Sequence, residues 1–234
     1  MLVLKPARKR ALWYATPRVT PTRRYPSLPA ISVLRKINAG DKATREGKTM
    51  ASAGLMGTEL GTKTVGIIGT GRIGIMTARL FKAFGCRLLG YSRSERDEAK
   101  QAGIEYVSLE ELLKESDIVS LHIPSTAATK GFLSAERIAL MKKSAILINC
   151  ARGAVVDNKA LADALNAENI AGAAIDVFDM EPPIPADYPL LSAKNTLLTP
   201  HVAFASKESM IRRAKIVFDN IYAYLDGKPV NVCD

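Results

Sequence analysis

The sequence predicts an α/β protein built on a parallel sheet with helices on both faces. Two observations predict this class: short apolar runs of strand length recur from residue 64 onward, and stretches with helical spacing separate several of them. Strands of a parallel sheet are buried on both sides, which explains why these runs are continuously apolar. The expected strands are residues 65–68, 87–91, 118–121, 145–148, 170–175 and 196–198.

The helices are expected from apolar spacing and from their end residues. Residues 72–84 place apolar side chains on one side of a helix, and residues 158–166 form another helical stretch. Ser108 with a glutamate three residues later is a capping box, which opens a short helix. The last helix is expected to begin near Ser206 and to end at Gly227, with an apolar stripe that packs on the domain or on a partner subunit.

The formal net charge of +10 is concentrated near the N-terminus. Residues 1–30 carry seven basic residues, no acidic residue and five prolines, residues 31–50 carry five basic and two acidic residues, and residues 51–234 carry 21 of each sign. The neutral body predicts no nucleic-acid partner. The proline density predicts an irregular basic arm over residues 1–30. We interpret this arm as a remnant of a larger N-terminal lobe, although a transit-like sequence or a nucleic-acid-binding tail is also compatible with its composition.

Composition excludes several classes of site. No apolar run approaches the ~20 residues of a membrane-spanning helix, so no membrane partner is expected. The three cysteines, Cys86, Cys150 and Cys233, are too few and too scattered for a disulfide framework or a zinc site. We therefore expect no metal, and a cytoplasmic location in a reducing compartment.

A glycine-rich turn follows the first expected strand and opens the first helix after it, with the sequence Gly69-Thr70-Gly71-Arg72-Ile73-Gly74. Gly69 permits the tight turn, Gly71 lets the backbone approach a pyrophosphate, and Gly74 lets the helix pack closely. The free N–H groups at Arg72 and Ile73 would face the phosphates. This context predicts a Rossmann-like dinucleotide-binding domain, which we assign to residues 59–204.

The end of the second expected strand bears on the choice of cofactor. A carboxylate at this position would hold the ribose hydroxyls of NAD, but this chain has Ser92 and Arg93. Serine does not repel a 2′-phosphate and the arginine can pair with it, so NADP is favoured. Alternatively, Arg93 is only solvated and NAD binds.

Three further segments supply reactive groups in a fixed order. Arg152 follows the strand 145–148, Glu181 lies five residues after Asp176, and His201 follows Pro200. Together they offer a cation, a carboxylate and an imidazole, which are the groups that reduction of a 2-keto acid by a nicotinamide cofactor needs.

The stretch 141–157, which contains Asn149-Cys150-Ala151-Arg152-Gly153, resembles the signature of the D-isomer-specific 2-hydroxyacid dehydrogenase family at nearly every position. The resemblance extends from about Gly57 to Val232. It implies a small 2-keto or 2-hydroxy acid as substrate and a homodimer. It also implies that Arg152 holds the substrate carboxylate, that His201 exchanges the proton, and that Glu181 pairs with His201.

The resemblance also implies how the cofactor is lined. Asp176 would be a partner for the nicotinamide carboxamide or, alternatively, would hold the loop that carries Glu181. The full set expected to bind the cofactor is Gly69, Gly71, Arg72, Ile73, Gly74, Ser92, Arg93, His122, Pro124, Cys150, Ala151 and Asp176.

The family's second lobe has little counterpart here. We expect residues 31–58 to be a helical remnant of the substrate lobe and the dimer segment, and residues 205–234 to be a C-terminal helix that returns to that lobe. About sixty residues precede the dinucleotide domain, so a truncated or frame-shifted chain is expected. The alternative function is therefore a catalytically weak NAD(P)-binding sensor or interaction module.

Overall fold

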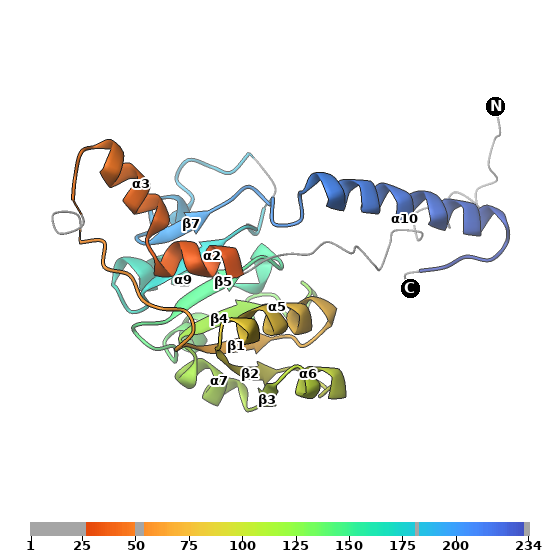
Figure 1. Ribbon diagram of the computed structural model, residues 1–234, viewed down its shortest axis with the longest axis horizontal. Coiled ribbons are helices and arrows are strands. Elements are labelled where there is room, and N and C mark those ends of the chain that lie inside the picture. Colours follow the sequence, from red (N-terminus) through yellow and green to blue (C-terminus); the bar gives the residue numbers. More distant parts are fainter. Residues whose placement is uncertain (1–26, 50–53, 181–182, 232–234) are drawn as a thin grey trace. The chain divides into compact units, whose positions relative to one another are not determined.

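The computed structural model describes residues 27–49, 54–180 and 183–231 (Figure 1). Its described part divides into two compact units between Ala203 and Phe204. The larger unit contains the sheet and its helices, and the smaller contains the C-terminal helix.

The larger unit is built on one parallel sheet of seven strands in the order β3-β2-β1-β4-β5-β6-β7. The order reverses between β1 and β4, which is the arrangement of a doubly wound fold with a crevice at that point. All six predicted strands are present, and the unpredicted β3 is a short edge strand. The strands are β1 (Thr64–Ile68), β2 (Arg87–Tyr91), β3 (Ile104–Tyr106), β4 (Ile118–Leu121), β5 (Ile146–Asn149), β6 (Gly172–Ile175) and β7 (Thr196–Leu198).

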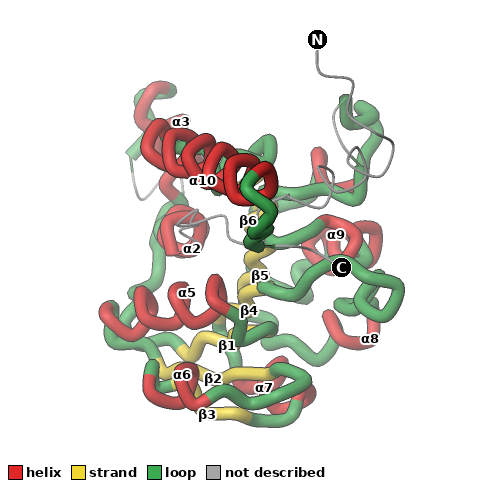
Figure 2. The backbone as a smooth tube through the Cα atoms, turned by 90° about the vertical axis from the view of Figure 1, so that its right-hand side faces the viewer, coloured by secondary structure: helices red, strands yellow, loops and turns green. Residues whose placement is uncertain are grey.

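Helices cover both faces of this sheet, as predicted (Figure 2). Helices α2 (Ser27–Leu34) and α5 (Arg72–Ala83) lie on one face, and α7 (Leu109–Glu115), α8 (Ala135–Ile138) and α9 (Asn158–Asn166) lie on the other. Each face has its own buried apolar cluster. In β1, Ile67 packs with α5 and Ile68 packs with α7, so successive side chains serve opposite faces.

Side chains cap the starts of two of these helices, and one of the caps is the predicted Ser108. The hydroxyl oxygen of Ser108 accepts a hydrogen bond from the N–H of Glu111 at 3.2 Å, at the start of α7. Asp157 accepts a hydrogen bond from the N–H of Ala160 at 2.9 Å, at the start of α9. Short helices α6 (Asp97–Gln101), η1 (Gly153–Val155) and η2 (Pro189–Ser192) complete the connections.

Helix α2 corrects the prediction for the N-terminal part of the chain. Residues 27–30 were expected to be irregular, but α2 begins at Ser27. Pro29 is tolerated because it lies in the first turn, where backbone N–H groups have no partner within the helix. Ala30 is fully buried among residues of the sheet, so α2 covers part of one face of the sheet. Helix α3 (Ile37–Arg45) follows, and residues 1–26 of the predicted arm lie outside the described residues.

The smaller unit contains helix α10 (Lys207–Leu225). Its start is as predicted, because the hydroxyl of Ser206 accepts a hydrogen bond from the N–H of Ser209 at 3.1 Å. Gly227 adopts a φ of 75° just after its end. Which surface its apolar stripe covers stays a prediction. Within the described ranges, no helix is long and apolar enough to cross a membrane.

Candidate active site

The glycine loop lies at the carboxyl edge of the sheet, between β1 and α5. Gly69 adopts a φ of 98°, which side chains disfavour, and a Cβ there would lie 2.8 Å from the carbonyl carbon of His122. A Cβ on Gly74 would lie 2.1 Å from the carbonyl oxygen of Gly69 and 3.2 Å from the side chain of Ile67. These two glycines therefore have the turn and packing roles that the spacing predicted.

Gly71 differs from its two neighbours, because a Cβ there would meet no protein atom within 4 Å. The structure itself does not demand glycine at this position, which fits a residue over which a ligand's phosphates must approach the backbone. Helix α5 begins at Arg72. Its N-cap residue is Gly71, which has no side chain that could accept a hydrogen bond from the first N–H groups of the helix. Its first N–H groups and the positive end of its dipole thus remain available for an anion.

The neighbouring strand ends complete the crevice. The N–H of His122, directly after β4, donates to the carbonyl oxygen of Ile68 at 2.7 Å, and its Nε2 lies 2.9 Å from the hydroxyl of Ser120. Pro124 is exposed two residues further on. Cys150 and Ala151 are buried directly after β5.

Ser92 and Arg93 lie directly after β2, with Ser92 half-buried and Arg93 exposed. The loop that carries them is held by the hydroxyl of Tyr106, which accepts a hydrogen bond from the N–H of Arg96 at 3.1 Å and lies 2.6 Å from the hydroxyl of Thr70. The predicted cofactor-binding residues therefore all follow carboxyl ends of strands, on the edge where open α/β sheets bind ligands.

Arg152 and His201 line one cavity of about 170 Å³ at this edge. They come from different loops, because Arg152 follows β5 and His201 follows β7. The rest of the lining is Gly153, Val177, Phe178, Met180 and Pro200. The cavity thus combines a guanidinium and an imidazole with apolar walls.

Asn149, the last residue of β5, braces the turn that carries Arg152. Its side-chain oxygen accepts from the N–H of Ala151 at 3.0 Å, and its side-chain nitrogen donates to the carbonyl oxygen of Arg152 at 3.0 Å. The guanidinium also donates to the carbonyl oxygen of Ala151 at 2.7 Å. Asn149 is fully buried, so its amide finds these partners without competition from water.

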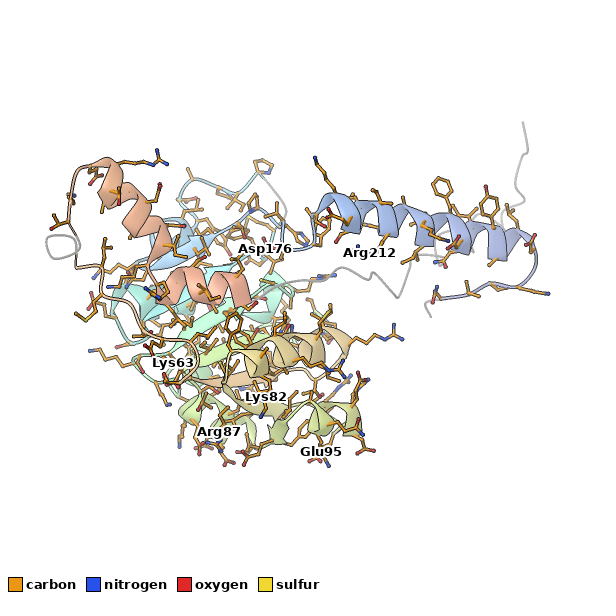
Figure 3. The ribbon with its side chains drawn as sticks, viewed as in Figure 1. Lys63, Lys82, Arg87, Glu95, Asp176 and Arg212 are labelled. Atoms are coloured by element: carbon orange, nitrogen blue, oxygen red, sulfur yellow. The ribbon has the colours of Figure 1, made fainter. Side chains whose placement is uncertain are left out.

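Asp176, directly after β6, braces the turn that carries His201. Its carboxylate accepts hydrogen bonds from the hydroxyl of Thr199 and from the N–H groups of Val202 and Ala203, at 2.6, 2.8 and 2.8 Å. Figure 3 shows the position of Asp176. One of the two roles predicted for Asp176 is to hold the loop that carries Glu181. The hydrogen bonds given above reach the turn that carries His201. Glu181 itself lies outside the described residues.

Gly153 also belongs to the site. It is part of the sequence motif that contains Arg152, but no role was predicted for it. A Cβ there would lie 1.8 Å from the carbonyl carbon of Phe178, so the loops after β5 and β6 touch backbone to backbone. The wall that Phe178 forms is further held by an edge contact with the ring of Tyr188 at 5.7 Å. The hydroxyl of Tyr188 donates to Asp179 at 2.7 Å, and burial, together with this bond, raises the pKa of Tyr188. In the sequence, the one indication of the contact between Gly153 and Phe178 is that a glycine directly follows Arg152.

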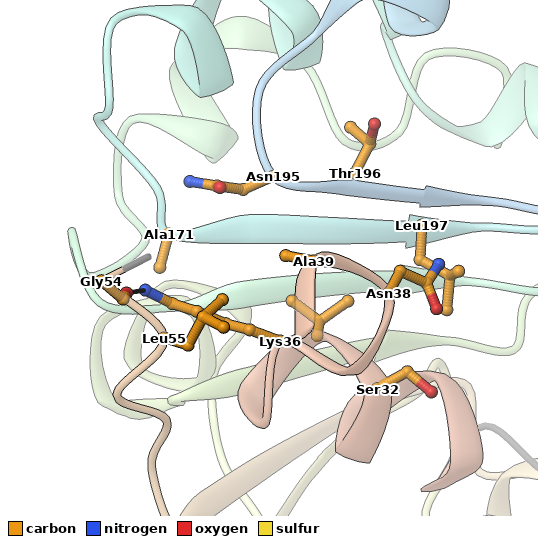
Figure 4. Close-up of a pocket in the computed structure, with 11 residues that line it drawn as sticks. Ser32, Lys36, Asn38, Ala39, Gly54, Leu55, Ala171, Asn195, Thr196 and Leu197 are labelled. Carbon is orange, nitrogen blue, oxygen red and sulfur yellow. Dashed lines mark hydrogen bonds between the residues drawn. The ribbon is translucent and has the colours of Figure 1, made fainter. Parts of the chain in front are cut away.

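A second cavity, of about 280 Å³, lies among residues that precede β6 and β7 and residues of α2 and α3 (Figure 4). Its lining includes one titratable side chain, Lys36, whose ammonium donates to the carbonyl oxygen of Gly54 at 3.0 Å. The reactive groups therefore belong to the smaller cavity. Among the described residues, no group of three or more His, Cys, Asp or Glu side chains is placed to hold a metal ion.

The fold and this edge define a dinucleotide-binding domain of the Rossmann type. Residues 29–203 match the family model described as D-isomer specific 2-hydroxyacid dehydrogenase, NAD binding domain. The chain belongs to this family, and its domain is an NAD(P)-binding domain.

Relatives and solved structures agree with this assignment. The glyoxylate reductase of Korarchaeum cryptofilum is 44% identical over 202 residues, which make up 85% of this chain and 60% of that protein. An acyclic imino acid reductase in complex with NADPH and D-Arg superposes with a TM-score of 0.82 at 33% identity, covering 92% of this chain and 69% of that one. The D-lactate dehydrogenase from Aquifex aeolicus, complexed with NAD and lactic acid, gives 0.79 at 33% identity, covering 86% and 65%. The chain thus spans about three fifths of the length of the glyoxylate reductase that it matches.

Proposed function

We propose that this protein is an NAD(P)-dependent oxidoreductase that transfers a hydride between nicotinamide and a small 2-keto or 2-hydroxy acid. The observation that carries the proposal is the pairing of Arg152 with His201 in one cavity of about 170 Å³, on the same sheet edge as the glycine loop. When bound, NAD(P)H would supply the hydride that the carbonyl carbon of the acid receives. The name of the matched glyoxylate reductase supports a substrate of this size.

Each reactive side chain has one task in this proposal. The planar guanidinium of Arg152 can hold the substrate carboxylate through paired hydrogen bonds and polarise the keto oxygen. The imidazole of His201 gives a proton to that oxygen during reduction and takes it back during oxidation. The carboxylate of Glu181 would pair with His201.

The cofactor would be held by the loop 69–74 and by the N-terminus of α5. We propose NADP as the preferred form of the cofactor. One support is the exposed side chain of Arg93 directly after β2, whose guanidinium can pair with the 2′-phosphate. The other is Ser92, because an acidic residue at this position would repel that phosphate. Arg93→Ala should then weaken NADPH binding about tenfold and leave NADH binding within about twofold. Fluorescence titration with both cofactors measures this difference.

The test of the function is oxidation of NADPH and NADH by the purified chain with hydroxypyruvate, glyoxylate, pyruvate and phenylpyruvate, beside His201→Ala. Turnover by the wild type that the variant loses supports the proposal. Cofactor binding without turnover on any of these acids contradicts it. We also propose a cytoplasmic homodimer, for which light scattering and cell fractionation are the measurements.

An NAD(P)-binding module with weak or no catalysis is the second candidate. It is favoured because the family model that matches, over residues 29–203, describes the NAD-binding domain alone. Arg152 and His201 in a common cavity favour the enzyme, since a binding module needs neither group there. The turnover assay separates the two candidates directly.

A further inference from the structure

Tyr106, the last residue of β3, connects two segments of the predicted cofactor site. Its hydroxyl lies 2.6 Å from the hydroxyl of Thr70 in the glycine loop, and it accepts a hydrogen bond from the N–H of Arg96 at 3.1 Å. A phenol can make both bonds at once, because it has one hydrogen to donate and lone pairs to accept. We call this pair of hydrogen bonds the Tyr106 brace.

The bond to Thr70 depends on the pairing of β2 with β3. Gly90 in β2 pairs directly with Tyr106 in β3, and a Cβ on Gly90 would lie 3.3 Å from the methyl carbon of Thr70. Thr70 is fully buried, so its hydroxyl needs a partner within the protein. Tyr106 supplies that partner next to a strand position that carries no side chain.

The loop after β2 is held at both of its ends. At its start, the carbonyl oxygen of Tyr91 accepts a hydrogen bond from the N–H of Gly69 at 2.8 Å. At its end, Tyr106 accepts the backbone bond described above. Residues 92–95 lie between these two bonds, and we call them the Arg93 loop. Both anchors therefore connect the Arg93 loop to the glycine loop, beside the strands β1, β2 and β3 (Figure 1).

The charges on and beside the Arg93 loop suit an anion. The side chains of Arg93 and Arg96 are both exposed. The acid of the loop, Glu95, pairs with Lys100 of α6 at 2.6 Å, and Figure 3 shows its position. The negative charge of Glu95 is thereby offset, and the guanidinium of Arg93 is the group directly after β2 that can pair with a 2′-phosphate.

We propose that Tyr106 is a positioning residue that sets the preference for NADP over NAD, because it holds the Arg93 loop at a fixed position beside the glycine loop. This rests on the proposed function, in which Arg93 pairs with the 2′-phosphate. Pairing of a guanidinium with a phosphate depends on direction, and a loop that is already ordered loses less entropy when the cofactor binds. The pyrophosphate, which both cofactors share, would bind at the glycine loop, so NAD gains less from the Tyr106 brace.

Tyr106→Phe tests the proposal because it keeps the ring and removes the hydroxyl. We expect the Kd of NADPH to rise about fivefold and the Kd of NADH to stay within about twofold of the wild type. Fluorescence titration of the purified chain with each cofactor gives both values and does not depend on turnover. If Tyr106→Phe leaves the Kd of NADPH unchanged, or raises both Kd values equally, the positioning role is wrong.

A double-mutant cycle shows whether Tyr106 acts through Arg93. In the Arg93→Ala background there is no guanidinium to position, so Tyr106→Phe should change the Kd of NADPH by less than about twofold. A purely structural role would weaken binding equally with and without the guanidinium. A rise of the same size in both backgrounds therefore contradicts the proposal.

Tyr188→Phe is the matched control. It also removes one hydroxyl that bonds another segment, the carboxylate of Asp179 at 2.7 Å, but its ring packs against Phe178 in the wall of the reactive cavity. We expect the ratio of the two Kd values to stay at its wild-type level. A ratio that falls as far as in Tyr106→Phe would show that loss of any such bond has this effect, and would overturn the proposal.

The other end of the Tyr106 brace offers a conservative pair of variants. Thr70→Ser keeps the hydroxyl and should preserve the wild-type preference for NADPH. Thr70→Val removes one of the two bonds and should lower the preference, by less than Tyr106→Phe does because the bond to Arg96 remains. Equal preferences in the two variants of Thr70 would contradict a role for this bond.

The proposed function and the Tyr106 brace can fail separately. Amide hydrogen exchange at Arg96, followed by NMR, should be faster in Tyr106→Phe because that N–H loses its acceptor, and this result needs no cofactor. A Kd of NADPH that Arg93→Ala leaves unchanged contradicts the NADP preference, and with it the task of Tyr106, even where faster exchange shows that the brace exists. An effect of Arg93→Ala on NADPH binding with none of Tyr106→Phe contradicts the role of Tyr106 alone.

Discussion

The glycine loop and the reactive cavity occupy the same sheet edge but are built in different ways. The loop consists of consecutive residues, and its shape comes from the backbone of Gly69 and Gly74. The cavity brings together Arg152 and His201, about fifty residues apart in the chain, and each is held by a buried residue at a strand end. Local backbone geometry therefore makes one half of the site, and the order of strands β5, β6 and β7 makes the other.

The largest expected effect breaks the cavity and leaves the loop intact. In Gly153→Ala the new methyl group would lie 1.8 Å from the carbonyl carbon of Phe178, and backbone cannot move aside as a flexible side chain can. We expect a loss of about 3 kcal/mol or more in the free energy of unfolding, measured by urea denaturation. Gly40→Ala, in α3, is the control, because a Cβ there meets no atom within 4 Å. Equal stability of the two variants would contradict the close approach.

The second prediction tests the cavity through its cation. Arg152→Lys keeps the positive charge but loses the planar fork, so kcat/KM for a 2-keto acid should fall about 100-fold while the affinity for NAD(P)H changes little. Arg137→Lys serves as the control. Arg137 also donates to a backbone carbonyl, that of Phe132, but it does not line the cavity. A similar loss in both variants would show that the effect is not specific to the cavity.

The third prediction breaks the loop and leaves the cavity intact. In Gly71→Ala the new methyl group meets no protein atom, so the free energy of unfolding should change by less than about 1 kcal/mol. The affinity for NAD(P)H should nevertheless fall about tenfold or more, since the methyl group would occupy the space that the phosphates need. Fluorescence titration and urea denaturation give the two values. Wild-type affinity would contradict the role of Gly71.

This contrast also explains what the sequence could and could not predict. The glycine roles followed from spacing alone, because they depend on residues within one turn of the chain. Six strands followed from apolar runs. The three residues of β3 form no such run, because Glu105 lies in the middle of the strand. Helix α2 was missed because prolines crowd the preceding segment.

The residues that support the cavity could not be inferred in the same way. Arg152 and His201 were recognisable by residue type and order. The partners of Asn149 and Asp176, and the backbone contact at Gly153, depend on which strand ends become neighbours in the sheet. These are tertiary contacts, and no local pattern encodes them.

The smallest expected effect concerns Tyr188, whose ring packs against Phe178 in the wall of the cavity. Tyr188→Phe removes the bond to Asp179 and should lower the free energy of unfolding by about 1 kcal/mol at pH 8. Burial raises the pKa of Tyr188 above its ordinary value near 10, and the bond to Asp179 adds to the shift. The tyrosine's contribution is therefore fully present below pH 10 and is lost as the pH rises toward the folded-state pKa, because the unfolded chain releases its proton first. Urea denaturation from pH 8 to pH 11 should show the wild type losing stability faster than the variant, and parallel curves would contradict the raised pKa.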